Sequence, residues 1–529
     1  MQILLNRYAS RRSPVMAANV IATSHPLASQ AGLSMIERGG NAVDAILAAA
    51  ITLTVVEPTG NGLGSDAFCI VSDGGALHGL NASGRSPAGW SPERFAGRSA
   101  MPERGFESVT VPGAVAGWVD LSKRFGALPF ADLFEPAISY AERGFVVTPM
   151  IGELWRRGAA TLNELPGFAE AFMPGGRAPR PGERFASALL ARSLRLIAET
   201  EGRSFYEGEL AQRITAFAAE HGACLTVDDL ASHRNDWCGT IGQSFADSAL
   251  HEIPPNGQGI AALMALGFLR SMGIEELDPD GAEAIHLQIE AMKLALADLH
   301  RHVADPAHMG MNTRDLLDPG YLGARAALIH RDRAQVFGAG APLHGGTVCL
   351  SAGDSGGMMV SYIQSNFSGF GSGIVVPGTG ISLQNRGFGF TLEPGHPNEV
   401  GGAKRPLHTI IPGFISRHGR DDTAFGIMGG PMQAQGHVQL FLRLQVWGQD
   451  PQTAADAPRW RFIEGNTTAI EGGVSPEAGE TLSAMGHRIV REPPEEVFGF
   501  GGAQIVKRLD GGGYCGGSDP RKDGQAVGM

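Results

Sequence analysis

Two segments near the start of the chain carry apolar patterns and capping residues that predict helices. Ser24-His25-Pro26 is typical of a helix start, and this helix is expected to end at Gly39-Gly40. Asn41 begins the second segment, in which residues 42–50 are apolar nearly all round. A helix without a polar face is expected inside the protein, so the sequence predicts a buried helix here.

Short apolar runs that flank turn residues predict the first strands, and helical patterns follow them. Residues 67–72 and 76–80 lie on either side of Asp73-Gly74-Gly75, which is a β-hairpin signal. From about residue 112 to residue 333 the pattern is mostly helical, with proline and glycine breaks. The clearest of these helices is expected over residues 285–302.

Strand-like runs dominate the last third of the chain. They cover residues 347–352, 358–364, 381–384 and 423–428, and are followed by a predicted helix over 433–447 and a hairpin around 509–513. Helices early in the chain and strands late in it, with a helix after them, predict an α+β fold in which helices cover sheets.

Composition and charge narrow the class of protein. The chain has 529 residues, 43% hydrophobic and 18% charged, which allows a large core. A net charge of −12 disfavours nucleic acid or an anionic membrane as the main partner. The five cysteines show no C-x-x-C spacing, and the first twelve residues lack the apolar core of a secretory signal, so we expect a cytoplasmic protein. No run of eighteen apolar residues predicts a membrane span.

Histidines near the end of the helix predicted over residues 285–302 are candidate metal ligands. His300 and His302 have His-x-His spacing, and His308 follows them. No carboxylate cluster lies beside them in the sequence, so a solvated helix end is the favoured interpretation. We therefore expect no metal and no organic cofactor.

The chemistry of the chain is expected at Gly345-Gly346-Thr347. Cleavage before Thr347 would give this residue a free α-amine beside its own hydroxyl, and a terminal amine can accept the hydroxyl proton near neutral pH. The alternative is that Thr347 only opens a half-buried strand, as threonine often does. Residues 334–346 are typical of a flexible linker, which suits a cleavage segment.

Short segments along nearly the whole chain carry a family resemblance. They are residues 22–28, 39–45, 56–58, 228–230, 254–259, 370–374, 404–407, 429–430 and 517–521. Together, and in this order, they resemble the γ-glutamyltranspeptidase family of N-terminal-nucleophile hydrolases. The resemblance implies a precursor that cleaves itself between Gly346 and Thr347. The large part, residues 1–346, and the small part, residues 347–529, would fold jointly as an αββα sandwich and stay together as a heterodimer, with a further dimer of these left open.

The resemblance also implies roles for individual residues. Thr347 would be the nucleophile, with Ser351 and Asp354 at the family's spacing behind it. Ser365 would be the hydroxyl residue that hydrogen-bonds the nucleophile, although an ordinary strand serine is the alternative. Gly429-Gly430 would form the oxyanion hole. Two glycines before a helix N-terminus let backbone N–H groups approach a developing oxyanion closely, and a tight strand-to-helix turn would use the same geometry.

The positions that hold the α-ammonium group of a γ-glutamyl donor differ in this chain. An ungapped count places Phe367, Arg386 and Gly389 where the family has an asparagine, a glutamine and an aspartate. A phenyl ring and a guanidinium group cannot accept hydrogen bonds from a cation, and Arg386 would repel it. The sequence therefore predicts a substrate without an α-ammonium group.

The groups that hold the donor's carboxylate in the family correspond to Arg85, offset by two residues, and to His408-Thr409. Guanidinium groups suit carboxylates because their paired N–H donors can bind both oxygens. We therefore expect a small-molecule amide that carries a carboxylate, bound by Arg386, Arg85, His408, Thr409 and Phe367. For Arg386 and Arg85, a structural ion pair is the alternative.

One branch of the family hydrolyses oxamate, the half-amide of oxalate, and this chain resembles that branch. Hydrolysis of oxamate to oxalate and ammonia is thus the favoured prediction. Three alternatives stay open: hydrolysis or transfer of γ-glutamyl amides such as glutathione, removal of glutaryl side chains from cephalosporins, and a non-catalytic binding protein with the same fold.

Overall fold

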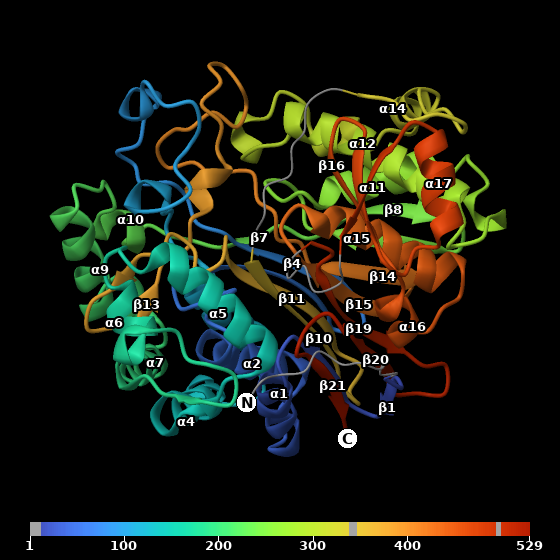
Figure 1. The fold of residues 1–529 in the computed structure, drawn as a ribbon. Helices are drawn as coiled ribbons and strands as arrows, with labels where there is room; N and C mark the ends of the chain where they lie inside the picture. Colours follow the sequence, from blue (N-terminus) through green and yellow to red (C-terminus); the bar gives the residue numbers. More distant parts are fainter. Residues whose placement is uncertain (1–11, 338–345, 493–498) are drawn as a thin grey trace.

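The computed structural model describes residues 12–337, 346–492 and 499–529 (Figure 1). Two seven-stranded sheets pack face to face at the centre, and helices cover the outer face of each. The predicted α+β class and αββα sandwich are thus confirmed. Within the described residues, no helix is both long and apolar enough to cross a membrane.

The sheet that contains Thr347 is called sheet I here. Its strands pair antiparallel throughout. In spatial order they are β21 (Gln525–Gly528), β2 (Val20–Thr23), β10 (Gly346–Gly353), β11 (Met359–Phe367), β3 (Asp66–Ser72), β4 (Leu77–Ala82) and β7 (Asp236–Trp237). Because β10 lies between β2 and β11, both of its edges are hydrogen-bonded.

The opposing sheet, sheet II, is also antiparallel. In spatial order its strands are β1 (Val15–Ala17), β20 (Tyr514–Ser518), β19 (Gly502–Arg508), β15 (Arg420–Met428), β14 (Gly413–Arg417), β9 (Ser248–Glu252) and β8 (Ile241–Phe245). Each sheet takes strands from both sides of the Gly346–Thr347 bond. Neither of the predicted parts therefore contains a complete sheet.

Strand β3 illustrates how both faces of a sheet are buried in this fold. Its side chains alternate: Phe68 and Ile70 join the apolar cluster between the sheets, while Cys69 and Val71 join the cluster under the helices. Apolar residues at every position, rather than at every second one, are what a strand needs when both of its faces are covered. The core is therefore three apolar layers, one between the sheets and one under each helical layer.

The helical layer on sheet I is built around α2 (Ala42–Val56), every residue of which is buried. Asn41 caps α2 in a capping box with Asp44, and the Asp354 carboxylate accepts a hydrogen bond from the Ala42 N–H at 2.7 Å. The other helices of this half are α1 (Pro26–Glu37), α3 (Ala114–Phe125), α4 (Glu135–Arg143), α5 (Pro149–Leu162), α6 (Phe168–Phe172), α7 (Ala188–Glu199), α8 (Arg203–Tyr206), α9 (Glu209–Glu220) and α10 (Val227–Ala231).

The helical layer on sheet II contains α11 (Gly259–Leu269), α12 (Ala282–His302) and α15 (Met432–Phe441), on the opposite side of the molecule in Figure 1. Shorter helices flank them: α13 (Thr313–Leu316), α14 (Pro319–Ala326), α16 (Pro451–Asp456) and α17 (Pro476–Ala484). Smaller sheets are formed by β5 (Phe145–Val146) with β6 (Arg184–Phe185), by β12 (Val375–Val376) with β13 (Ile381–Ser382), and by β16 (Trp460–Glu464), β17 (Thr467–Glu471) and β18 (Arg488–Glu492).

The structure differs from the predicted elements in a few places. The stretch from residue 112 to residue 333 was expected to be mostly helical, yet it includes the hairpin of β8 and β9 in sheet II. The helix expected over residues 433–447 is α15 followed by a π-helical turn, Leu442–Val446. Within the predicted linker, residues 338–345 lie outside the described residues, and Gly346 already belongs to β10.

A buried ion cluster ties the C-terminal motif to the start of β19. The Arg459 guanidinium lies 2.6 Å from the Asp519 carboxylate and donates to the Phe500 carbonyl at 2.8 Å, and Asp519 accepts from the Ala503 N–H at 2.8 Å. Arg521 bonds to Asp519 from the other side at 3.1 Å. Burial opposes ionisation, but the two guanidinium groups hold the pKa of Asp519 down to about 2.

We predict that Asp519→Asn lowers the free energy of unfolding by about 3–5 kcal/mol, because two buried guanidinium groups lose a counter-charge. Since the pKa of Asp519 in the folded state is about 2, below the value of about 4 expected when unfolded, its contribution is present above pH 4 and is lost as the pH falls through 2. Urea unfolding measures the change. Glu153→Gln, in the exposed pair with Arg156, is the control and should cost under about 0.5 kcal/mol; equal losses would contradict the prediction.

Candidate active site

Thr347 lies at the beginning of β10, an interior strand of sheet I, and its side chain is fully buried. A β-bulge surrounds it: Gly346 pairs with Phe367 and Val348 with Gln364, so two residues of β11 face the single residue Thr347. Bulges re-aim side chains, and they are common beside active sites. One of the two residues opposite Thr347 is Ser365.

Two polar side chains contact the Thr347 hydroxyl. The hydroxyl donates to Ser365 Oγ at 3.2 Å, and Gln433 Nε2 donates to Thr347 Oγ1 at 3.4 Å. Ser365 Oγ also accepts from the Phe367 N–H at 2.7 Å. The Thr347 oxygen is therefore held in one orientation. The neighbouring Cys349 is a poor rival nucleophile, because burial raises the pKa of its thiol well above the usual value.

Gly429 and Gly430 form the turn between β15 and α15. Both have backbone angles that favour glycine, with φ of +126° and +61°. A Cβ atom on Gly429 would also lie only 3.0 Å from the Gly501 Cα. The turn is continuous with the helix because the Gln433 N–H donates to the Gly430 carbonyl at 3.1 Å. The ion cluster of Arg459 and Asp519 holds Phe500 and Ala503, and so supports the segment on which Gly429 packs.

Arg386 is buried, with 1% of its surface exposed. Its Nη1 donates to Thr409 Oγ1 at 2.9 Å, and its guanidinium carbon lies 4.7 Å from the centre of the Phe367 ring. Nε and Nη2 have no hydrogen-bond partner among the described residues. Burial lowers the pKa of Arg386 to about 9, against the opposing charge of Asp66, so the group is cationic at neutral pH. A buried cation with unused N–H donors is a site for an anion.

Asp66 and His408 form a buried pair near Arg386. Burial raises the pKa of Asp66 to about 7, although Arg386 and the N–H groups of Gly113 and Gly84 favour its ionised form. His408 Nε2 lies 3.2 Å from the Asp66 carboxylate, and its Nδ1 accepts from the Ile410 N–H at 3.4 Å, which assigns the ring proton to Nε2. Burial, with Arg386 second, lowers the pKa of His408 far below the usual range. His408 is therefore a neutral donor to Asp66.

The contacts around Thr347 close into a ring, which we call the site ring. Gln258 Nε2 closes the gap between its two halves, donating to the Gly430 carbonyl at 2.9 Å and also to the Thr409 carbonyl. The ring runs through Thr347, Ser365, Phe367, Arg386, Thr409, Gln258, Gly430 and Gln433 and returns to Thr347. The Thr347 hydroxyl, the glycine turn and the buried Arg386 cation are thus linked in one ring of contacts.

Phe367 is the residue of the site ring with the least usual backbone. Its φ of +78° lies in the left-handed region, which bulky residues rarely adopt. Such strain persists only where the surroundings impose it, and it is concentrated at functional sites. The Gly346 pairing and the bond from the Phe367 N–H to Ser365 impose it here, and they turn the ring over Arg386.

Other predicted residues lie outside the site ring. Arg85 is half-buried, and its guanidinium lies 3.9 Å from the carboxylate of Asp236, which also binds Arg405. Ser351 donates to the Gln504 carbonyl at 3.1 Å, so this motif residue, like Asp354 at the N-terminus of α2, has a structural contact.

A cavity of about 340 Å³ adjoins the site ring. Gln258, Phe367 and Thr409 line it as well as belonging to the ring, and Gly389 also lies in its wall. His300, which the sequence placed at a solvated helix end, is half-buried and lines this cavity. The reason is that residues 388–409 cover the end of α12, where His396 Nε2 bonds the His300 carbonyl at 2.8 Å.

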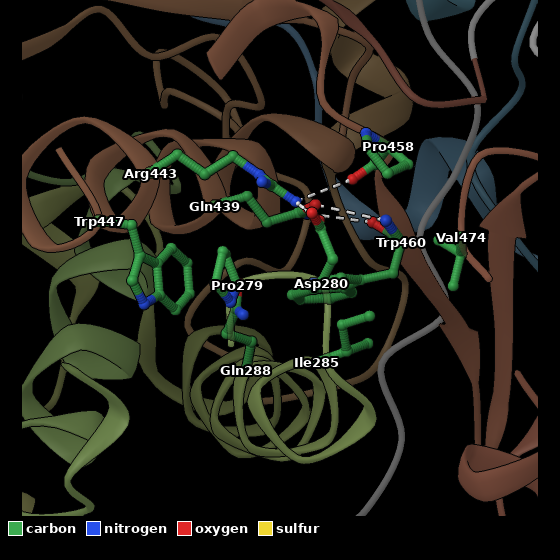
Figure 2. A pocket seen from close by; sticks show the side chains of 10 residues that line it. All are labelled: Pro279, Asp280, Ile285, Gln288, Gln439, Arg443, Trp447, Pro458, Trp460 and Val474. Carbon is green, nitrogen blue, oxygen red and sulfur yellow. Dashed lines mark hydrogen bonds and ion pairs between the residues drawn. The ribbon is translucent and has the colours of Figure 1, made fainter. Parts of the chain in front are cut away.

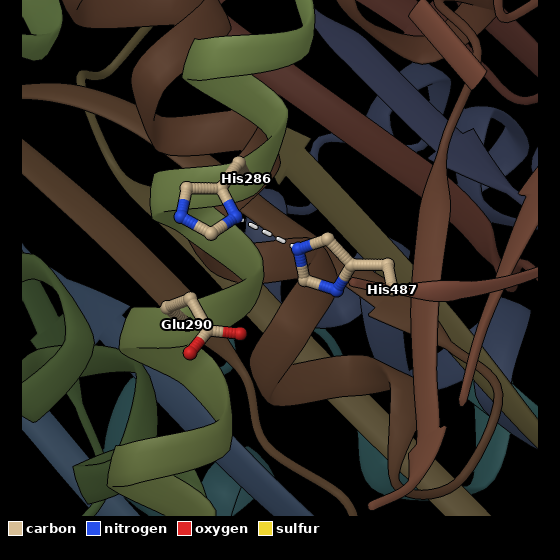
Figure 3. A group of neighbouring side chains, drawn as sticks. All are labelled: His286, Glu290 and His487. Atoms are coloured by element: carbon tan, nitrogen blue, oxygen red, sulfur yellow. Dashed lines mark hydrogen bonds between the residues drawn. The ribbon is translucent and has the colours of Figure 1, made fainter. Parts of the chain in front are cut away.

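A second cluster of potential metal ligands lies between α12 and the residues that join α17 to β18, away from the predicted histidines. The ligand atoms of His286, Glu290 and His487 lie within 4.8 Å of one another, and all three residues are buried (Figure 3). His286 Nδ1 and His487 Nε2 are already 2.8 Å apart in a hydrogen bond, and the Lys293 ammonium lies 2.6 Å from Glu290. Since Lys293 supplies the positive charge that a metal would bring, this geometry favours a hydrogen-bonded structural cluster.

Two other hollows contain no residue of the site ring. The cavity in Figure 2, between α12 and α15, holds about 10 Å³, room for one water molecule, and Arg443 closes it through a 2.7 Å bond to Asp280. A wider hollow of about 950 Å³ is lined by residues between 149 and 181.

Sequence reasoning missed Gln258, Gln433 and Asp66. Gln258 lies within the resembling segment 254–259, and Gln433 three residues after Gly430, but nothing in the local sequence indicated their contacts. Asp66 follows a glycine-rich stretch, residues 60–64, and no role was predicted for it from the sequence.

Comparisons with known proteins agree with this geometry. The family model described as gamma-glutamyltranspeptidase matches residues 28–529. The oxamate amidohydrolase proenzyme of Klebsiella pneumoniae is 35% identical over 98% of this chain and 99% of its own length. The glutathione hydrolase-like YwrD proenzyme of Bacillus subtilis is 34% identical over 98% of this chain and all of its own.

A solved structure extends the likeness to three dimensions. The crystal structure of cephalosporin acylase from Bacillus halodurans aligns with a TM-score of 0.95 and 42% identity, over 100% of this chain and 99% of that one. The chain therefore belongs to the γ-glutamyltranspeptidase family and is an enzyme of the N-terminal-nucleophile hydrolase class.

Proposed function

We propose that the chain is a precursor that cleaves itself between Gly346 and Thr347, and that the mature protein is a threonine amidohydrolase. Residues 1–346 and 347–529 would remain together as a heterodimer, because both sheets take strands from each part. The names of two relatives, each a proenzyme, support self-cleavage. We place the enzyme in the cytoplasm and assign it no cofactor.

The proposed reaction uses the groups of the site ring. Thr347 Oγ attacks the amide carbonyl while the Thr347 α-amine takes the hydroxyl proton, and the N–H groups of Gly429 and Gly430 stabilise the oxyanion. Ser365 and Gln433 orient the attacking oxygen. The α-ammonium returns the proton to the departing nitrogen as the C–N bond breaks. Water, deprotonated by the same amine, then hydrolyses the ester and frees the acid.

Our proposal for the substrate rests on the surroundings of Arg386. Its free N–H donors, its burial and its place in the site ring support binding of a carboxylate on the acyl side of the amide. A γ-glutamyl α-ammonium would meet a cation and a phenyl ring instead of acceptors. We therefore propose an amide with a carboxylate and no α-ammonium. Oxamate is the smallest such compound, and it is our first candidate, in keeping with the Klebsiella relative's name.

A glutaryl amide is the second candidate. It also presents a carboxylate without an ammonium group, and the likeness to a solved cephalosporin acylase supports it. A γ-glutamyl amide such as glutathione is disfavoured by Arg386. A non-catalytic binding protein is disfavoured by the complete site ring, which a scaffold does not need.

We predict that Thr347→Ala abolishes both self-cleavage and turnover, because it removes the only oxygen proposed to attack. Gel electrophoresis should show a single 55.5 kDa band, whereas the wild type gives two fragments, the smaller beginning at Thr347. Thr347→Ser, which keeps the hydroxyl, is the matched control and should retain both activities in part. An alanine variant that hydrolyses amides would refute the assignment.

We predict that Arg386→Met raises KM for oxamate by about 10- to 100-fold, the equivalent of losing hydrogen bonds to a charged group. Steady-state ammonia release measures it. Oxamide, which has no carboxylate, is the control substrate and should respond far less. Arg386→Lys should recover part of the loss, because it restores the charge without the paired donors. The same rise in KM for both substrates would contradict a carboxylate-binding role.

We predict that KM for an anionic amide rises by up to about tenfold between pH 6 and pH 8. Asp66, with a pKa raised to about 7, gains negative charge over this interval and offsets the Arg386 cation that the substrate needs. In Asp66→Asn the rise should disappear. A pH dependence of KM that is unchanged in this variant would assign the effect to another group.

A further inference from the structure

Two segments, the end of α12 and the residues between β13 and β14, form most of the wall of the 340 Å³ cavity beside the site ring. The end of α12 contributes Leu296, Leu299 and His300, and Val303 follows them. Opposite lie Phe388, Phe390, Thr391 and Leu407, from the segment between β13 and β14. The two walls come from opposite sides of the Gly346–Thr347 bond, so the cavity exists only where the two parts meet.

The cavity adjoins the site ring through residues that contact Arg386 on one side and Gly430 on the other. Phe367 and Thr409 line it and also contact Arg386, while Gln258 and Pro431 line it next to Gly430. A carbonyl placed between Thr347 and the glycine turn, with its carboxylate on Arg386, has its remaining substituent, the amide nitrogen, free to point into this space.

The cavity suits an uncharged apolar group. The Phe367 and Phe388 rings lie 6.0 Å apart at 44°, and a further aromatic ring could pack against both. Burial, with His396 second, lowers the pKa of His300, so this ring is neutral at neutral pH. Glu393 is the one carboxylate among the lining residues and is exposed at the rim. Apart from Glu393, the described lining residues include no aspartate, glutamate, lysine or arginine.

Hydrogen bonds within its own segment hold one wall of the cavity in place. Asn398 is buried and bonds three backbone groups of its own segment: its Nδ2 donates to the Gly389 carbonyl at 2.7 Å, its Oδ1 accepts from the Leu407 N–H at 2.9 Å, and its carbonyl accepts from the Thr391 N–H at 3.0 Å. A cavity whose wall is held by its own hydrogen bonds favours affinity, because little has to be ordered on binding.

We propose that this cavity is a leaving-group subsite and that, among amides of the same acid, the enzyme prefers N-substituted ones whose amine carries an aromatic or similarly apolar body over the primary amide. The inference rests on the proposed function and extends it. In the reaction the C–N bond breaks, the amine departs as R–NH2 with the proton held by the Thr347 α-ammonium, and water supplies the oxygen that releases the acid. A primary amide such as oxamate leaves the cavity empty and forgoes its binding energy.

The test compares substrates that share an acyl group and differ in the amine: oxamate with N-phenyloxamate, and glutaramate with glutaric acid monoanilide. Fully cleaved protein should hydrolyse each anilide with kcat/KM about 10- to 100-fold above the primary amide, which corresponds to burying one aromatic ring. Equal or lower values for the anilides would overturn the inference.

Two variants that fill the cavity sharpen the test. Leu407→Trp and Thr391→Phe, at half-buried positions in its wall, should each reduce the anilide-to-primary-amide ratio at least tenfold. Leu189→Phe, at an exposed position on α7, is the matched control and should leave the ratio unchanged. Cleavage and melting temperature report whether each variant folds. A larger effect on glutaramate than on N-phenyloxamate would assign the cavity to the acyl chain and overturn the inference.

A wrong assignment of the proposed function can be told apart from a wrong assignment of the subsite. If the cleaved protein hydrolyses none of the four compounds, the amidohydrolase assignment to carboxylate-bearing amides fails. Saturation-transfer NMR with aniline, the amine product, then tests whether the cavity binds an aromatic amine. Transfer to aniline in the wild type that is lost in both Leu407→Trp and Thr391→Phe supports an apolar subsite, and no transfer in the wild type overturns it.

Discussion

Strand β10, which carries Thr347, is paired with a neighbouring strand on each side, and this pairing positions the candidate active site. A nucleophile that is also a chain terminus would ordinarily lie on a frayed end. Here the first residue of the proposed small part begins a central strand, and β2 and β11 hold the residues that follow it. The bulge opposite Thr347 then brings Ser365 to its hydroxyl. After the proposed cleavage, strand pairing would thus give Thr347 the rigidity of a core residue although it is a chain terminus.

The positive charge of Arg386 is only partly compensated by the groups around it. Arg386 is surrounded by groups that contribute little opposing charge: a phenyl ring, a threonine hydroxyl and, further off, a carboxyl whose pKa burial raises to about 7. His408 is neutral and holds that carboxyl in place. A buried cation left so incompletely paired is costly, and the anionic substrate that we propose would offset the cost. The same balance disfavours a substrate that brings its own cation.

The sequence was sufficient for features that local residues determine and insufficient for those that distant contacts create. The buried helix α2, the β3–β4 hairpin and the glycine turn at residues 429–430 follow from local patterns, and the structure contains all three. The β8–β9 hairpin was missed because Ala246, rather than glycine or asparagine, takes the positive φ of its turn. Gln258 and the cavity depend on contacts between residues more than a hundred positions apart, which no local pattern indicates.

Two chromogenic substrates that differ only in the α-ammonium group test most directly whether the pocket excludes that group. Mature enzyme is given glutaryl 4-nitroanilide and γ-glutamyl 4-nitroanilide, and kcat/KM is measured for both at pH 7. Arg386 and Phe367 predict a clear preference for the glutaryl compound, because the ammonium group would lie beside a buried cation without an acceptor. A preference for the γ-glutamyl compound would contradict this account of the pocket.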